Sequence, residues 1–227
     1  MDRLRIEDGR HPFVLATNQI AEINRRAALS DHPIAKLVAI ATLIPCDPYE
    51  LSRSPVRAFD RREDVIMLRR PSGGPSRIAL GRAAAAAVRD AIGGRTRGLI
   101  VEDAYGSGIV PDADTVEYAH ELLSCADTAP LPFGFTFRSL REGVFGGMVD
   151  GVVPLDVAEA QAGLHHANVG RGCKTMRRIG QRAASDWWAL TLGIPMPVTI
   201  DVLRRALDRT GREDRPDGSD ELRHDGS

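Results

Sequence analysis

The sequence has few aromatic residues and few cysteines. Aromatic side chains make up 5% of the 227 residues, so alanine and the aliphatic side chains must fill most of any core. The three cysteines, Cys46, Cys125 and Cys173, stand far apart, and no Cys-x-x-Cys pair occurs. This pattern argues against a disulfide framework and against a structural zinc site built from cysteines. An odd number of thiols fits a reducing compartment better than secretion.

The sequence also lacks a long apolar run. The longest, residues 37–44, falls far short of the roughly 20 residues that a membrane-spanning helix needs. Residues 1–12 are polar and contain no apolar centre of the kind found in signal peptides. We therefore expect a soluble, cytoplasmic protein with no membrane partner.

Neither sign of charge is in clear excess. The chain has 30 Lys and Arg against 31 Asp and Glu, which gives a net charge of −1. Because no global positive field steers the protein toward nucleic acid, we do not expect nucleic acid as a partner. Hydrophobic residues at 43% and charged residues at 27% are typical of a globular protein. We predict a single globular domain over residues 1–210 and a disordered polar tail over 211–227.

Hydrophobic periodicity and turn residues divide the chain into helices and strands. Helices are expected at 17–29, 34–44, 81–92, 112–125, 154–166, 171–190 and 199–209. Strands are expected at 64–69, 76–80, 98–102, 133–137 and 144–153. The first two strands form a hairpin; a glycine-rich phosphate loop is the alternative for their turn, but the Lys-Ser/Thr ending of such a loop is absent. Because the strands cluster in the middle, we predict an α+β fold with a central mixed β-sheet that includes the hairpin, flanked by helices at both ends of the chain.

A basic stripe is expected on the helix over residues 171–190. At about 100° per residue, four cations fall on one arc, and an apolar face lies opposite. Two glycines flank the helix start, where free backbone N–H groups bind anions. We therefore predict that an anionic substrate binds to Gly170, Arg171, Gly172, Lys174, Arg178 and Arg182. The alternative is a solvated basic face over a core helix.

Cys173 is expected in the first turn of the same helix, beside Arg171 and Lys174. Positive charge and a helix N-terminus both favour the thiolate over the thiol. Cys173 is therefore a candidate catalytic nucleophile, and the alternative is an inert, buried cysteine.

Glu102 and Asp103 end the apolar stretch 98–102 and precede a glycine loop. Functional groups gather at the carboxyl ends of strands, so both acids are candidate catalytic acid/base groups. They also suit Mg²⁺, which carboxylates bind together with substrate phosphates. The alternative is a pair of solvated acids that pair with the basic helix. No protein metal site is predicted, because the His-Glu-x-x-His spacing is absent.

The loop that follows this acid pair resembles the diphosphate-ribose loop of phosphoribosyltransferases. In that family the acids contact ribose hydroxyls and backbone N–H groups bind phosphate, and the resemblance implies the same roles here. The pattern departs from the family, because no Thr-Gly-x-Thr follows the acids and Ile109, Val110 and Pro111 interrupt the position where phosphate would bind.

Two clusters of opposite charge, each beside a glycine loop, favour an enzyme. We predict a cytosolic enzyme, a transferase or a lyase, that acts on a small carboxylated or phosphorylated metabolite. One alternative is a nucleic-acid-binding or regulatory module that uses the basic helix 171–182. Another is a protein-interaction subunit, with Trp187, Trp188 and the last predicted helix, 199–209, as its interface. A homo-oligomer is a further option for the partner.

Overall fold

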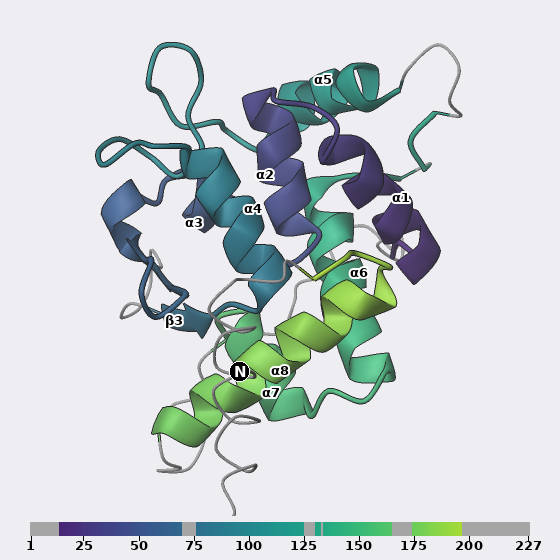
Figure 1. The fold of residues 1–227 in the computed structure, drawn as a ribbon. Helices are drawn as coiled ribbons and strands as arrows, with labels where there is room; N and C mark the ends of the chain where they lie inside the picture. Colours follow the sequence, from purple (N-terminus) through teal and green to yellow (C-terminus); the bar gives the residue numbers. More distant parts are fainter. Residues whose placement is uncertain (1–13, 70–75, 125–129, 133, 165–173, 197–227) are drawn as a thin grey trace, which may run out of the picture. The chain divides into compact units, whose positions relative to one another are not determined.

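The computed structural model describes residues 14–69, 76–124, 130–132, 134–164 and 174–196. Internal contacts divide the chain into two units, residues 1–196 and 197–227, and every described element belongs to the first. The predicted helix 199–209 and the predicted tail 211–227 lie outside the described residues. The elements, in chain order, are α1 (Thr17–Ala27), α2 (Pro33–Ala41), α3 (Pro48–Ser52), η1 (Val56–Ala58), β1 (Phe59–Asp60), β2 (Val65–Leu68), β3 (Ser76–Ala79), α4 (Arg82–Ile92), α5 (Ala113–Leu123), α6 (Phe137–Asp150), α7 (Leu155–Gln161) and α8 (Lys174–Thr191) (Figure 1).

Helix α2 lies at the centre of the helical packing and contacts α1, α3, α4, α5 and α6. It begins with Pro33 at its first position, and the ring of His32 accepts a hydrogen bond from the N–H of Ile34. Proline at this position needs no N–H partner, which is why the sequence starts a helix here. Five of its other side chains are buried apolar groups, and Lys36 is its one charged residue, as expected for a helix that is hydrophobic nearly all round.

Thr42, at the end of α2, forms hydrogen bonds with both α1 and α8. Its hydroxyl accepts a hydrogen bond of 2.6 Å from the side-chain amide of Asn24 on α1. Its carbonyl accepts one of 2.8 Å from the indole N–H of Trp188 on α8. Trp188 is fully buried, so this bond satisfies a donor that has no access to water. The tryptophan is therefore part of the core.

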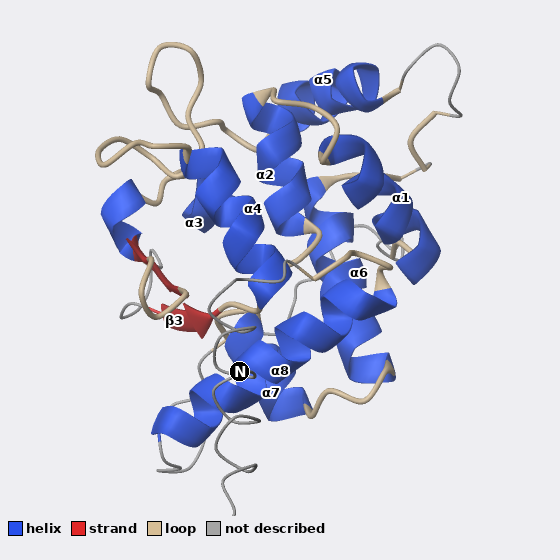
Figure 2. Cartoon of the chain, in the orientation of Figure 1, coloured by secondary structure: helices blue, strands red, loops and turns tan. Residues whose placement is uncertain are grey.

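The sheet has three short antiparallel strands in the order β1-β2-β3. Figure 2 shows in red how little of the described chain is strand beside the helices. Val65 pairs with Ala79 and Leu68 pairs with Ser76, so the predicted hairpin is confirmed. The α+β class is likewise confirmed, since the described chain combines these strands with many helices. The sheet is small and antiparallel, however, and a central mixed sheet is not what the described residues form.

Three predicted strand regions are wrong. The described part of the first, residues 134–137, forms a turn, the N-cap Thr136 and the start of α6. The other two are wrong for physical reasons. Of these, 144–153 belongs largely to α6. Thr136 and Ser139 cap its start reciprocally, and Leu140, Val144 and Met148 are buried at a spacing of four residues. The last, 98–102, forms only isolated bridges rather than a strand. Ile100 and Val101 are buried as part of an irregular segment that follows α4.

Among the described residues, no helix is long and apolar enough to cross a membrane.

Candidate functional site

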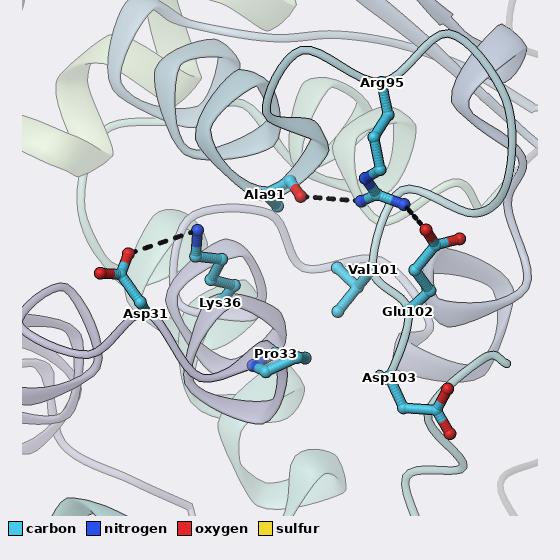
Figure 3. Close-up of a pocket in the computed structure, with 8 residues that line it drawn as sticks. All are labelled: Asp31, Pro33, Lys36, Ala91, Arg95, Val101, Glu102 and Asp103. Atoms are coloured by element: carbon cyan, nitrogen blue, oxygen red, sulfur yellow. Dashed lines mark hydrogen bonds and ion pairs between the residues drawn. The ribbon is translucent and has the colours of Figure 1, made fainter. Parts of the chain in front are cut away.

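The structure places the predicted acid pair beside two adjoining hollows. The first, of about 250 Å³, is lined by Asp31, Pro33, Lys36, Ala91, Arg95, Val101, Glu102 and Asp103 (Figure 3). The second, of about 340 Å³, shares Pro33, Glu102 and Asp103 and adds His32, Ile34, Ala104 and Ile109. These residues come from the turn before α2, the first turn of α2, the end of α4 and the loop that follows α4.

Both acids have partners within their own loop. Glu102 forms an ion pair with Arg95, and its other oxygen accepts a hydrogen bond of 2.9 Å from the N–H of Leu99. The carboxylate of Asp103 accepts hydrogen bonds from the N–H groups of Tyr105 and Ser107. The two carboxylates therefore stabilise the conformation of the loop. A catalytic role for either acid stays a prediction.

The cations that face the first hollow are also paired. Lys36 lies 3.5 Å from a carboxylate oxygen of Asp31 and 3.3 Å from one of Asp90. The guanidinium of Arg95 donates to backbone carbonyls at the end of α4 and to those of Leu99 and Ile100, at 2.9–3.0 Å. Arg95 thus joins the loop to the helix that precedes it (Figure 3).

The hollow also offers no evident metal site. Within the described part of the chain, no group of three or more His, Cys, Asp or Glu side chains could hold a metal ion. The sequence leaves the cofactor unknown, and Mg²⁺ on the acid pair stays one untested option.

The predicted basic helix exists as α8, but its described cations are engaged. Arg178 lies 3.2 Å from the carboxylate of Glu63, and Arg182 donates to the backbone carbonyl of the same residue. Lys174 is the first residue of α8, and nothing is described of its side chain. The predicted Gly170, Arg171, Gly172 and Cys173 lie outside the described residues.

The acid pair and the described part of the basic helix do not share a pocket. No described residue of α8 lines either hollow. Asp186 of α8 accepts a hydrogen bond from Arg82, the first residue of α4. Arg95, which lines the first hollow, donates to carbonyls in the last turn of α4. The two ends of a helix of this length lie roughly 15 Å apart, so α8 bonds α4 at the end away from the hollow.

A group of exposed arginines, which the sequence reasoning missed, lies near the segment after α3. We define the arginine group as Arg53, Arg57, Arg61 and Arg97, all of which are exposed. Two backbone hydrogen bonds, of 2.9 and 2.8 Å, join Val56 to Gly98 and Ile100 to Ser54. Arg57 and Arg97 each neighbour the first of these bonds, and Arg53 neighbours the second.

A signal for this group was present in the sequence as charge segregation. Residues 53–97 hold eleven arginines and only four acids, whereas residues 98–124 hold six acids and neither Lys nor Arg. The balanced total conceals this asymmetry, because the two stretches nearly cancel. Net charge alone therefore gave no reason to expect a basic surface.

Comparison with known proteins identifies the fold but not a family. No protein-family model matches the sequence, and no curated protein matches it. The fold is similar to that of a recombinase. XerA recombinase superposes with a TM-score of 0.56 at 12% identity, over 92% of this chain and 67% of that one. The integrase of transposon Tn1549, solved in complex with transposon right end DNA, gives 0.54 at 13% identity, over 91% and 68%.

These similarities correct three expectations. The prediction of an enzyme acting on a small anionic metabolite is wrong, because the folds that this chain shares are those of a recombinase and an integrase. For the same reason, the small anionic substrate as partner and the exclusion of nucleic acid are both withdrawn. The structural resemblance covers nearly the whole chain, whereas the resemblance to phosphoribosyltransferases rested on one short loop.

Proposed function

We propose that this chain binds double-stranded DNA. The observation that carries the proposal is the similarity of fold over more than nine-tenths of the chain to XerA recombinase and to an integrase solved on transposon-end DNA. The nucleic-acid-binding alternative derived from the basic residues fits this fold better than the metabolite enzyme does. The cytoplasmic location expected from the sequence stays a prediction.

The distribution of charge supports the proposal. Protein–DNA affinity comes largely from Arg and Lys side chains that neutralise phosphates, and this needs a local basic surface rather than a basic protein. The exposed arginine group, Arg53, Arg57, Arg61 and Arg97, supplies positive charge for such a surface. Arg178 and Arg182 of α8 contribute less support, because both already bond to Glu63.

A titration of the full-length chain against a labelled duplex of about 30 base pairs, followed by fluorescence anisotropy, tests the proposal. We expect binding at about 50 mM salt and a steep loss by about 200 mM, because each neutralised phosphate contributes a slope of roughly −0.9 to log K against log[salt]. ATP or inorganic phosphate at equal ionic strength should not compete with the duplex. Absence of binding at about 50 mM salt, with the protein folded, would refute the proposal.

A further inference from the structure

The arginine group is held by an ordered backbone. Apart from the two hydrogen bonds described above, Pro55 and Leu99 form an antiparallel bridge, and the guanidinium of Arg61 donates at 2.9 Å to the carbonyl of Arg95. Gly98 adopts a φ of +85°, and a Cβ there would lie 2.3 Å from a carboxylate oxygen of Glu102. Several hydrogen bonds therefore order the backbone from which the arginines project. This order limits the conformational entropy that the chain loses when the arginines bind a ligand.

The acids near this group are already occupied. Glu102 pairs with Arg95, Asp64 pairs with Arg89, and Glu63 pairs with Arg178. Asp60 accepts hydrogen bonds from the N–H groups of its own turn, at Arg62 and Glu63, and these bonds are the first cause of the lowered pKa of Asp60. These carboxylates therefore interact with other arginines or with the backbone of their own turn, and not with the arginine group.

The charges of the group therefore stay uncompensated within the described part of the chain, since Arg61 bonds only to a neutral carbonyl. Arg53, Arg57 and Arg97 have no ion-pair partner among the described residues. Like charges close together on a surface repel one another, so such a cluster costs stability unless a polyanion is present. A guanidinium binds phosphate in a bidentate manner, which suits a repeating phosphodiester chain.

We infer that the arginine group lies on the phosphate backbone of duplex DNA and makes contacts that do not read the base sequence. This inference rests on the proposed DNA binding and assigns the surface for it. The adjoining stretch 98–124, with its six acids, must then face away from the DNA, because phosphates repel it. The arginine group thus fixes the side from which the duplex approaches.

The test compares two variants that change the net charge equally. Arg57→Gln with Arg97→Gln removes two positive charges from the group and takes the net charge from −1 to −3. Arg25→Glu makes the same change in net charge on α1. Arg25 is exposed, and its one ion pair among the described residues is with the neighbouring Glu22, outside the arginine group. Circular dichroism and thermal unfolding confirm that both variants are folded.

We expect the double variant to bind two duplexes of unrelated sequence about tenfold more weakly, and its salt slope to fall by about 2, one for each lost phosphate contact. Arg25→Glu should keep the slope of the wild-type chain. An unchanged slope in the double variant, or an equal fall in both variants, would overturn the assignment of this surface while leaving DNA binding in place. Absence of binding by the wild-type chain would refute the proposed function instead.

Chemical modification tests the same surface without substitutions. Phenylglyoxal modifies accessible arginines, and mass spectrometry locates the modified sites. With saturating duplex, Arg57 and Arg97 should be protected while Arg25 stays reactive. Equal reactivity of all three arginines with and without DNA would contradict the inference.

Discussion

Two adjacent glycines of α6 face different surroundings, and they show how much one Cβ can matter. A Cβ on Gly147 would lie 2.6 Å from two ring atoms of Trp188, whereas a Cβ on Gly146 would meet nothing within 4 Å. Gly147 is therefore required for the close approach of α6 to the buried indole. Gly146 has no such role and costs the helix conformational entropy.

We predict that Gly147→Ala destabilises the protein by about 1–3 kcal/mol, because the ring of Trp188 is buried and cannot shift freely. Gly146→Ala should be neutral or stabilise it by up to about 1 kcal/mol, since alanine has the higher helix propensity. Urea unfolding of both variants measures the difference. Equal free energies of unfolding would show that the indole moves aside at no cost.

The same glycines explain why the residue pattern predicts a strand over 144–153, where the structure has most of these residues in α6. A stretch with Gly146, Gly147 and Gly151 among valines reads as a strand when local propensity is considered alone. In the structure, Gly143 and Gly147 permit contacts with residues far away in the sequence, Leu15 and Trp188. Tertiary contacts of this kind cannot be read from a single chain.

At the scale of elements, α4 illustrates a helix whose cap comes from another helix. Its N-cap residue, Gly81, has no side chain to offer. The carboxylate of Asp186 on α8 accepts a hydrogen bond of 2.7 Å from the N–H of Arg82 and lies 3.3 Å from its guanidinium. This carboxylate also compensates the positive end of the helix dipole.

We predict that Asp186→Ala lowers the free energy of unfolding by about 1 kcal/mol, within the range of about 0.5–2 for a lost cap. Asp186→Asn should lose clearly less, because the amide oxygen still accepts the bond from Arg82 and only the charge is removed. Chemical denaturation of the two variants compares them directly. Equal losses would mean that the charge, rather than the hydrogen bond, stabilises the helix start.

Elements with local signals were predictable, and elements with distant ones were not. The helices α1, α2, α4 and α5 and the β2–β3 hairpin all follow from periodicity, proline, glycine or an acidic N-cap close by in the sequence. For α5, Asp112 caps its own helix through the N–H of Thr115. The strand predicted at 98–102 was wrong because the hydrogen-bond partners of this stretch lie at residues 54–56. They are too far away along the chain for any local rule to find.

At the scale of the whole molecule, the predicted site depended on where charges meet in space. The sequence predicts a basic stripe and an acid pair, but their described members find partners close by: Glu63 for Arg178 and Arg182 of α8, and Arg95 for Glu102. Cations that have no ion-pair partner among the described residues include Arg53, Arg57 and Arg97, which no motif marks. Only the fold shows which charges remain for a partner.

The face of α5 carries the opposite charge and should weaken DNA binding from a distance. Asp114, Glu117 and Glu121 follow one another at helical spacing, and all three are exposed. They lie in the stretch that we place away from DNA, so they act only through the electrostatic field. That field is screened over about 10 Å at 0.1 M salt and about 3 Å at 1 M.

We therefore predict that Glu117→Gln with Glu121→Gln, which changes the net charge from −1 to +1, tightens DNA binding about two- to fivefold at roughly 50 mM salt. The gain should vanish near 0.5 M, where screening removes long-range terms but leaves direct contacts largely in place. Glu117→Asp with Glu121→Asp keeps the charge and should bind as the wild-type chain does. Fluorescence anisotropy across this salt range measures all three proteins. A gain that persists at high salt would place α5 against the DNA itself, which contradicts the orientation set by the arginine group.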